Sequence, residues 1–440
     1  MQSGDTQDSQ VSNVIGTFVQ LLSFDMSSDF ETTSTEVAEI FANVGGAFSS
    51  GWISSVYASQ GFAATLSVGC KYNNATGTCD QSTFILGFDI SGIAPTPFSY
   101  AEIPGQPLNE YSADLYQGHL RVVTTEWFWS ETTSSTSNRI FVLKVPKADG
   151  SEGPEMLLTG KTDHVGKPNE QVMSVRFMET KAYIVTFERT DPFYVFNLTD
   201  PSNPQKIGEL EIPGFSSYLH PIEIDGVPLM LGIGSHVNET TGWETGLKIS
   251  LLNVSDPMNL KEIAVLVDEG AYSSGRCVHE LDDQRCIHVT DDHRNQDHIL
   301  TCLTSCIAYF SRYCTHLMHS WDFKSFRYLP LSQKLILPKT EYTWTDAGNF
   351  DGFVVYDITL DEIAPSYNIQ HASSYDMHYG CWYSAYMPAR SLVFQSKLTT
   401  ILSHSVMSTD LDTGEKLWNL TLQVLDNTLC VHRISISRKI

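Results

Sequence analysis

The sequence has 440 residues, of which 42% are hydrophobic and 18% are charged, so it has the composition of a globular protein with a large core. Its 27 basic and 51 acidic side chains give a formal net charge of −24 at pH 7. A surface this acidic repels nucleic acid and anionic lipid, which excludes both as main partners. No apolar run reaches the roughly 18 residues of a membrane-spanning helix, so we expect no such segment in this chain.

The chain begins with Met1-Gln-Ser-Gly-Asp, which is polar and acidic and does not resemble a signal peptide. Either the protein is cytosolic or the sequence lacks its true start. The cysteines and glycosylation motifs described below favour the second alternative. We therefore predict an extracellular or cell-surface location, with the signal sequence absent from this chain.

Almost no stretch has the periodicity of an amphipathic helix, whereas β-rich segments bounded by Gly, Pro, Asn and Asp recur throughout. The clearest copies start at Phe193 and Ile249, and each reads as a strand, an Asp-Pro turn and a second strand. The Asp side chain is expected to cap the turn, and Pro fixes its φ angle. Around the first copy the pattern predicts four strands, at residues 172–177, 181–187, 192–197 and 205–212.

Weaker copies of this element occur along the rest of the chain. Aligning one polar position in each copy gives residues 25, 89, 144, 197, 253, 357 and 410, with Lys at position 144. The usual interval is about 54 residues, with one gap of about twice that length, and such a period is typical of a β-propeller. The predicted fold class is therefore all-β, a β-propeller of four-stranded blades, with seven blades favoured and six or eight as alternatives.

A propeller blade needs a neighbour on each of its two faces, so the array has to close into a ring. The first copy, near Asp25, leaves no room for two preceding strands. Strands near the C-terminus, such as residues 429–437, are candidates to complete it. We therefore predict a single domain over residues 1–440 that is closed by its N- and C-terminal strands.

The stretch from Val175-Arg-Phe-Met-Glu-Thr-Lys-Ala-Tyr to Asp191-Pro-Phe-Tyr-Val resembles the central signature of the secreted β-propeller domain family, which is distantly related to WD40 propellers. Residues 115–125, 208–221 and 246–251 are also similar to this family. The resemblance covers roughly residues 50 to 360. It implies a propeller that is typically exported, and it supplies no established catalytic residues.

Residues 275–313 do not fit the family pattern and contain a repeated Cys-x-His motif, Cys277-Val-His279 and Cys286-Ile-His288. The segment is a degenerate blade, an insert within one blade, or an error in the gene model. Residues i and i+2 of a strand share a face, so a hairpin would bring Cys277, His279, Cys286 and His288 together as ligands of Zn²⁺. The spacing matches no known zinc motif, and a Cys277–Cys286 disulfide or unpaired residues are the alternatives. We expect no cofactor, with Zn²⁺ or Ca²⁺ as the ions to test.

Cys70 and Cys79 flank a loop rich in turn-forming residues, which makes them a second candidate disulfide in an oxidising compartment. The nine cysteines leave at least one thiol unpaired in a monomer. Two of the five Asn-X-Ser/Thr motifs occupy equivalent places in the repeat and are explained equally well by its turn chemistry. The candidate glycosylation sites are Asn74, Asn197, Asn238, Asn253 and Asn419.

The sequence contains no Gly-x-Ser-x-Gly, no His-Glu-x-x-His and no phosphate-binding Gly-rich loop, so we predict no catalytic residue. The predicted function is that of a secreted or cell-surface propeller that binds or scaffolds an unknown protein or glycan ligand through loops at one face. The alternative is a propeller enzyme, a hydrolase or lyase, with carboxylates and His converging at the mouth of the channel. An aromatic mouth favours binding, whereas a cluster of Asp, Glu and His favours catalysis.

Overall fold

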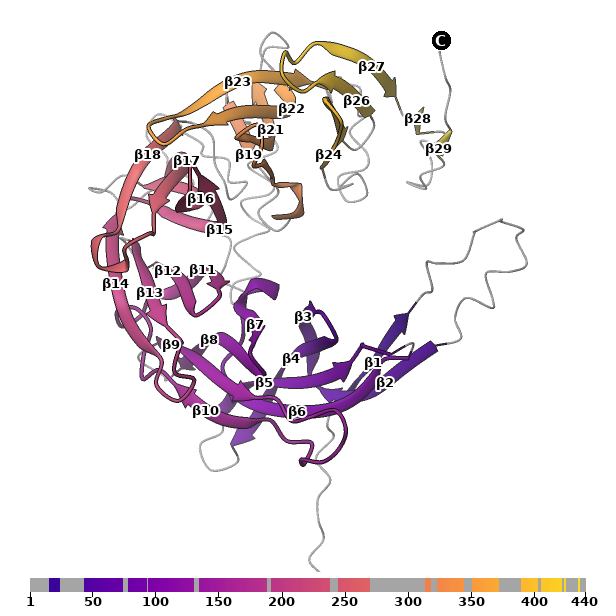
Figure 1. Cartoon of the computed structure of the whole chain (residues 1–440), viewed down its shortest axis with the longest axis vertical. Helices are drawn as coiled ribbons and strands as arrows, with labels where there is room; N and C mark the ends of the chain where they lie inside the picture. Colours follow the sequence, from indigo (N-terminus) through magenta and orange to yellow (C-terminus); the bar gives the residue numbers. More distant parts are fainter. Residues whose placement is uncertain are drawn as a thin grey trace, which may run out of the picture. The chain divides into compact units, whose positions relative to one another are not determined.

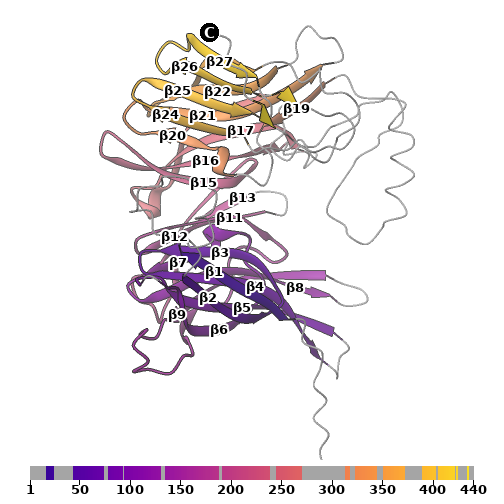
Figure 2. The ribbon, with the colours of Figure 1, turned by 90° about the vertical axis from the view of Figure 1, so that its right-hand side faces the viewer.

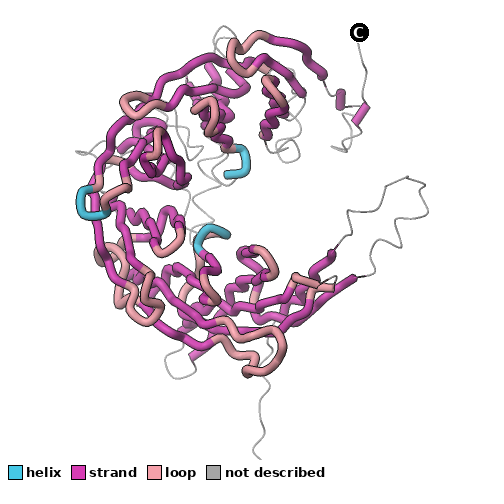
Figure 3. The backbone as a smooth tube through the Cα atoms, viewed as in Figure 1, coloured by secondary structure: helices cyan, strands magenta, loops and turns pink. Residues whose placement is uncertain are grey.

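The computed structural model describes residues 16–23, 43–73, 78–92, 94–129, 134–187, 191–237, 244–269, 313–317, 323–343, 350–371, 389–402, 405–421, 423–424 and 434–435. Contacts divide the chain into two compact units, Met1–Glu211 and Ile212–Ile440, which we treat separately (Figure 1). Within the described residues the only helical segments are three 3-10 turns, and strands account for most of the rest (Figure 3). None of these turns is long and apolar enough to cross a membrane.

The first unit contains three four-stranded antiparallel sheets, in each of which the strands follow one another in chain order. They are preceded by a two-stranded sheet of β1 (Gly16–Ser23) and β2 (Asn43–Ser50). The long strands β4 and β5 lie side by side in both views of the ribbon (Figures 1 and 2). The sheets consist of β3 (Trp52–Ser59), β4 (Phe62–Asn73), β5 (Thr78–Asp89) and β6 (Thr96–Pro104); β7 (Ala113–Tyr116), β8 (His119–Trp129), β9 (Ser134–Lys144) and β10 (Leu157–Lys161); and β11 (Gln171–Met178), β12 (Lys181–Phe187), β13 (Asp191–Asn197) and β14 (Gln205–Ile212).

The second unit repeats this arrangement in three further sheets. In the middle sheet, β19 and β20 pair with different halves of β21 and together fill the place of one strand. The last described strands, β28 (Gln423–Val424) and β29 (Ile434–Ser435), form a two-stranded sheet. The larger sheets consist of β15 (Phe215–Ile224), β16 (Val227–Val237), β17 (Glu244–Asn253) and β18 (Lys261–Glu269); β19 (Tyr313–Leu317), β20 (Arg327–Leu329), β21 (Lys334–Thr343), β22 (Phe350–Ile358) and β23 (Ile363–Gln370); and β24 (Arg390–Phe394), β25 (Lys397–Leu402), β26 (Ser405–Asp410) and β27 (Lys416–Thr421).

The predicted repeat corresponds to one sheet. The four strands expected between residues 172 and 212 are β11 to β14, and their predicted limits agree with the structure within one residue. Six of the seven aligned polar positions lie at the end of the third strand of a sheet or one residue before it: 89, 144, 197, 253, 357 and 410. The seventh, Asp25, lies outside the described residues. The period of about 54 residues is therefore the length of one sheet and its connection to the next.

Side-chain hydrogen bonds explain why this position is polar. Asn197 Oδ1 accepts hydrogen bonds from the Thr199 backbone N–H at 3.0 Å and from its hydroxyl at 2.6 Å. Asn253 Oδ1 binds Ser255 with the same two distances. The predicted cap of the Asp-Pro turn is also confirmed, because Asp200 Oδ1 accepts from the Ser202 backbone N–H at 2.9 Å. A short polar side chain at this point closes the turn that follows the third strand in the sheets with Asp89, Asn197, Asn253 and Asp410.

The core lies between the faces of neighbouring sheets. The middle strands, such as β12 and β16, are buried on both faces, which explains their almost continuous runs of apolar residues. Leu66 and Leu120 belong to the cluster that joins the first two sheets of the first unit. Val123 and Ile184 belong to the cluster that joins the second and third. The four-stranded sheets of the first unit thus bury their apolar faces against one another, as the repeat requires.

Three predictions about the fold stay predictions. The described residues hold six sheets with a path of four strands and two sheets of two strands, and the number of blades is not fixed by them. Closure of a single domain by the terminal strands is equally untested. The unusual segment 275–313 lies outside the described residues, apart from Tyr313 at the start of β19.

Candidate functional site

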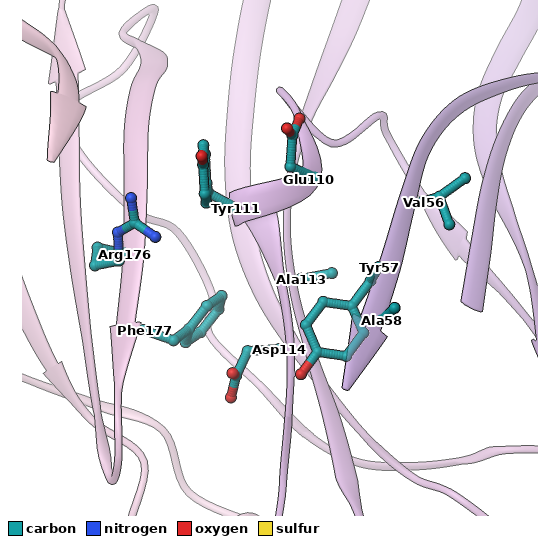
Figure 4. A pocket seen from close by; sticks show the side chains of 9 residues that line it. All are labelled: Val56, Tyr57, Ala58, Glu110, Tyr111, Ala113, Asp114, Arg176 and Phe177. Carbon is teal, nitrogen blue, oxygen red and sulfur yellow. The ribbon is translucent and has the colours of Figure 1, made fainter. Parts of the chain in front are cut away.

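A pocket of about 310 Å³ opens in the first unit, where the first strands of its three four-stranded sheets approach one another (Figure 4). Strands β3, β7 and β11 contribute to its walls, together with the 3-10 turn η2 (Glu110–Ser112) that leads into β7. The pocket thus draws side chains from three successive repeats. The lining residues are Val56, Tyr57, Ala58, Glu110, Tyr111, Ala113, Asp114, Arg176 and Phe177.

The turn η2 is fixed by a capping box. Asn109 Oδ1 accepts a hydrogen bond from the Tyr111 backbone N–H at 3.0 Å, and the Asn109 backbone N–H donates to Ser112 Oγ at 3.3 Å. These reciprocal bonds satisfy donors that a short helical turn leaves open. Because Ser112 is fully buried, the turn is anchored at its end, and Glu110 and Tyr111 are held at the rim of the pocket.

Arg121 on β8 fixes one wall of the pocket from behind. Its side chain is almost fully buried and donates to Asp114 Oδ2 through Nε at 3.1 Å and through Nη2, while Nη1 donates to the Glu179 carbonyl. The rings of Tyr116 and Phe177 lie with their centroids 4.9 Å from its Cζ. A planar guanidinium can satisfy acceptors at its edge and aromatic rings at its faces at the same time. Arg121 therefore positions Asp114 and Phe177, which belong to two different sheets.

The remaining walls are held by contacts between strands. Tyr57 Oη accepts a hydrogen bond from the Leu115 backbone N–H at 2.9 Å, which ties β3 to β7 and fixes the tyrosine ring. The Arg176 guanidinium lies 4.1 Å from the centroid of the Tyr111 ring. Figure 4 shows the rings of Tyr57 and Phe177 on either side of the Asp114 carboxylate. Aromatic surfaces thus surround a small number of polar groups, which is the usual composition of a ligand site.

A second polar network lies between the second and third sheets of the same unit. Asn138 is fully buried, and its Nδ2 donates to the carbonyls of Val165 at 3.0 Å and Glu170 at 2.9 Å. Glu170 Oε2 accepts hydrogen bonds from Thr186 Oγ1 at 2.6 Å and from the Lys167 backbone N–H at 2.7 Å. Since these partners are all protein groups, we interpret this network as a joint between sheets and not as a binding site.

The predicted cysteine pair lies on neighbouring strands. The pairing register places Cys70 on β4 opposite Gln81, and Cys79 on β5 opposite Tyr72. The two cysteines are therefore diagonal neighbours and not directly opposite each other, and their disulfide stays a prediction. Within the described residues there is no group of three or more His, Cys, Asp or Glu side chains that could hold a metal ion.

The other predicted site residues are scattered along the chain. Asn197 and Asn253 end β13 and β17, and Asn419 lies exposed on β27. Glycosylation of these residues stays a prediction. The remaining candidates lie outside the described residues: Asn74, Asn238, Cys277, His279, Cys286 and His288.

None of the pocket residues was predicted as a site residue from the sequence. Tyr57, Asp114 and Arg176 lie about one repeat apart, so no local motif contains them. Two signals were available. Arg176 and Phe177 fall within the family signature, and the spacing of Asn109 and Ser112 marks the capped turn that carries Glu110.

The chain belongs to the Beta propeller domain family, whose model matches residues 6–291 and 311–414. This confirms the resemblance seen in the sequence. Together with the six repeated antiparallel sheets, it establishes the all-β propeller fold class.

Among known proteins, an uncharacterized protein of Methanocaldococcus jannaschii is 39% identical over 181 residues, which are 40% of this chain and 26% of that protein. An uncharacterized protein of Archaeoglobus fulgidus is 39% identical over 160 residues, 36% of this chain and 22% of that protein. The match thus spans about a quarter of the length of these curated relatives.

Solved structures align over most of the chain at low identity. A crystal structure of a protein from Lactobacillus plantarum aligns with 92% of this chain and 96% of its own, with 10% identity and a TM-score of 0.43. A europium-containing methanol dehydrogenase aligns with 82% of this chain and 76% of its own, with 8% identity and a TM-score of 0.35.

Proposed function

We propose that this propeller is a ligand-binding module and that the pocket of the first unit is its binding site. The observation that carries the proposal is that contacts within the protein fix the pocket walls. Arg121 holds Asp114 and Phe177, and the Leu115 backbone holds Tyr57. A site that is ordered in advance loses less conformational entropy when a ligand binds.

The residue types in the pocket support binding as its main role. Tyr57, Tyr111 and Phe177 supply aromatic surface, which the sequence analysis associated with a binding propeller. Glu110 and Asp114 are two carboxylates in the same pocket, and they are the specific observation that keeps a hydrolase as the second candidate. Both functions predict that a ligand occupies this pocket. A binding module releases the ligand chemically unchanged, whereas an enzyme converts it.

The experiment is a ligand-observed NMR screen of a library of small polar and aromatic compounds against the full chain. We expect compounds that bind the unchanged protein to bind Glu110→Gln and Phe177→Leu more weakly. The matched control is Glu102→Gln, which removes an exposed carboxylate on the outer strand β6. If the binding of every compound is unaffected by the two pocket variants, the pocket is not the binding site. Conversion of a bound compound by the unchanged protein but not by Glu110→Gln would establish the enzyme instead.

We also infer that the protein works outside the cell or on its surface. The exposed position of Asn419 supports this inference, because a glycosylation acceptor has to be accessible. The test is the intact mass of the chain expressed through a secretory pathway. Each glycan adds a large increment, and each disulfide removes two hydrogens. A mass equal to that of the reduced, unmodified chain would contradict the inference.

A further inference from the structure

We infer that the ligand of the pocket is a neutral glycan, bound through one or two sugar rings. This inference rests on the proposed function, because it specifies the chemical class of the ligand for the same site. It is carried by the aromatic walls, by the acceptor atoms that the protein leaves open, and by the signs of the charges in the lining.

The walls offer the flat surfaces on which a sugar ring packs. A pyranose has faces of C–H groups and an edge of hydroxyls, so it is recognised by aromatic rings from one side and by polar groups from the other. The Tyr57 hydroxyl is bonded to the Leu115 backbone, so the body of its ring is what it contributes to the pocket. Phe177 is half-buried and is held in place by Arg121.

The acceptor atoms match a row of hydroxyl donors. Within the part of the chain that the structure describes, Asp114 is hydrogen-bonded only through Oδ2, which leaves Oδ1 for a ligand. Among the same residues the Glu110 carboxylate has no hydrogen-bond partner at all, although it lines the pocket. A carboxylate accepts charge-assisted hydrogen bonds from hydroxyl donors, and it is strictly an acceptor when ionised.

The charges in the lining argue against an ionic ligand. Glu110 and Asp114 repel a phosphate, a sulfate or a uronate, and the net charge of −24 over the chain adds to this repulsion. The Arg176 guanidinium in the wall repels an amine. A ligand with many hydroxyls and no charge meets neither penalty. The volume of about 310 Å³ lies at the low end of the range of about 300–1,000 Å³ for ligand pockets, which suits one or two sugar rings.

The test measures binding of methyl glycosides to the full chain by saturation-transfer NMR and calorimetry. The neutral probes are the methyl glycosides of glucose, mannose, galactose and N-acetylglucosamine, and the charged probes are methyl glucuronide and glucosamine. We expect at least one neutral probe to bind with a Kd on the order of 1 mM, and both charged probes to bind about tenfold more weakly.

Three variants locate the binding. Glu110→Gln removes the carboxylate that accepts hydrogen bonds from the sugar hydroxyls, and it should weaken binding of the neutral probes about tenfold. The control Glu102→Gln should leave their binding unchanged. Tyr57→Phe keeps the ring but loses the bond from the Leu115 backbone that holds it, so it should weaken neutral binding less than Glu110→Gln does. Unchanged melting temperatures of the variants establish that their folds are intact.

The outcomes separate the class of ligand from the site. If a charged probe binds at least as tightly as every neutral one and Glu110→Gln still weakens it, the site stands and the inference of a neutral glycan is wrong. If sugars bind equally to Glu110→Gln and Glu102→Gln, they bind elsewhere, and both the inference and the proposed function fail for this pocket. If no sugar binds at 20 mM, on the order of ten times the expected Kd, the inference is overturned, and the library screen still tests the site.

Discussion

Two joints between neighbouring sheets, one in each unit, are built by different chemistry. In the first unit, the charged residues Arg121 and Glu170 are 2% and 3% exposed and lie between sheets. In the second unit, β23 meets the following sheet through His371, whose Nδ1 lies 2.5 Å from Ser405 Oγ and whose Nε2 lies 2.8 Å from Thr400 Oγ1. One joint of the first unit thus uses buried full charges, whereas this joint of the second unit uses a histidine between two hydroxyls. Other joints of the second unit also carry charged side chains, Lys339 with Asp268 and Arg327 with Ser391, but none of them lines the pocket.

The comparison suggests a role for the buried Arg121 of the first unit in positioning the pocket. A buried ion pair is seldom more stable than well-packed apolar residues of the same volume, because desolvation offsets the attraction. Its advantage is directional, since a guanidinium fixes its partners in one plane. Arg121 has two of the pocket residues, Asp114 and Phe177, as its partners. We therefore interpret the charged joint as a device that positions the pocket, with stability as a secondary effect.

The largest effect is expected from deleting residues 419–440, which tests whether the two units can be compared as independent parts. If the terminal strands close one domain, as the repeat pattern predicts, the deletion should lower the melting temperature by about 10 °C or more. Hydrogen exchange should accelerate in β8 of the first unit as well as in β16 of the second. If only the second unit becomes less protected, the units fold separately and the prediction of one closed domain is wrong.

The next largest effect is expected for Arg121→Met. This change leaves the Asp114 carboxylate and the Glu179 carbonyl without their donor and should reduce the free energy of unfolding by about 3 kcal/mol. The figure is at the low end for a buried pair because the Asp114 side chain is 28% exposed. Denaturant unfolding measures it, and adding Asp114→Asn should restore part of the loss. The control Lys206→Met breaks an exposed pair with Glu209 and should cost under about 0.5 kcal/mol.

A smaller effect is expected for His371→Phe in the second unit. The ring keeps its packing against Phe353, while the hydroxyls of Ser405 and Thr400 each lose a partner. We expect a loss of about 2 kcal/mol in the same unfolding experiment, with ligand binding by the first unit unchanged. A loss larger than that of Arg121→Met would contradict the distinction between the charged joint and the hydroxyl joint.

The smallest effect concerns the capped turns. Hydrogen bonds from the Ser202 hydroxyl and backbone N–H hold the pKa of Asp200 below its usual value of 3.8, and Ser91 acts in the same way on Asp89. A carboxylate whose pKa is lower in the folded state adds stability above its unfolded pKa and loses it as pH falls through the folded value. The melting temperature of the unchanged chain should therefore fall more steeply than that of Asp200→Asn below about pH 4. Parallel curves down to pH 2.5 would show that the charge of Asp200 contributes nothing to stability.

The sequence predicted the repeat far better than the pocket. The limits of β11 to β14 follow from local signals, because alternating residues and Asp-Pro turns mark each strand and each reversal. The joint of Arg121, Asp114 and the Glu179 carbonyl depends on how two sheets meet, and that geometry has no local pattern. Glu110 was missed for a similar reason, since its role depends on a three-residue turn that brings it beside strands from two other repeats.

The side-chain cap found at the end of four of the third strands, at Asp89, Asn197, Asn253 and Asp410, has a consequence for how this family can evolve. The turn needs one side-chain oxygen as acceptor, and both Asp and Asn supply it, as Asp89 and Asn197 do here. Asp89 is followed by Ile90 and Ser91. The single substitution Asp89→Asn would therefore create an Asn-X-Ser glycosylation motif and keep the same turn. At such a sheet end, a glycosylation motif can therefore be gained or lost by a single substitution that keeps the acceptor oxygen of the turn.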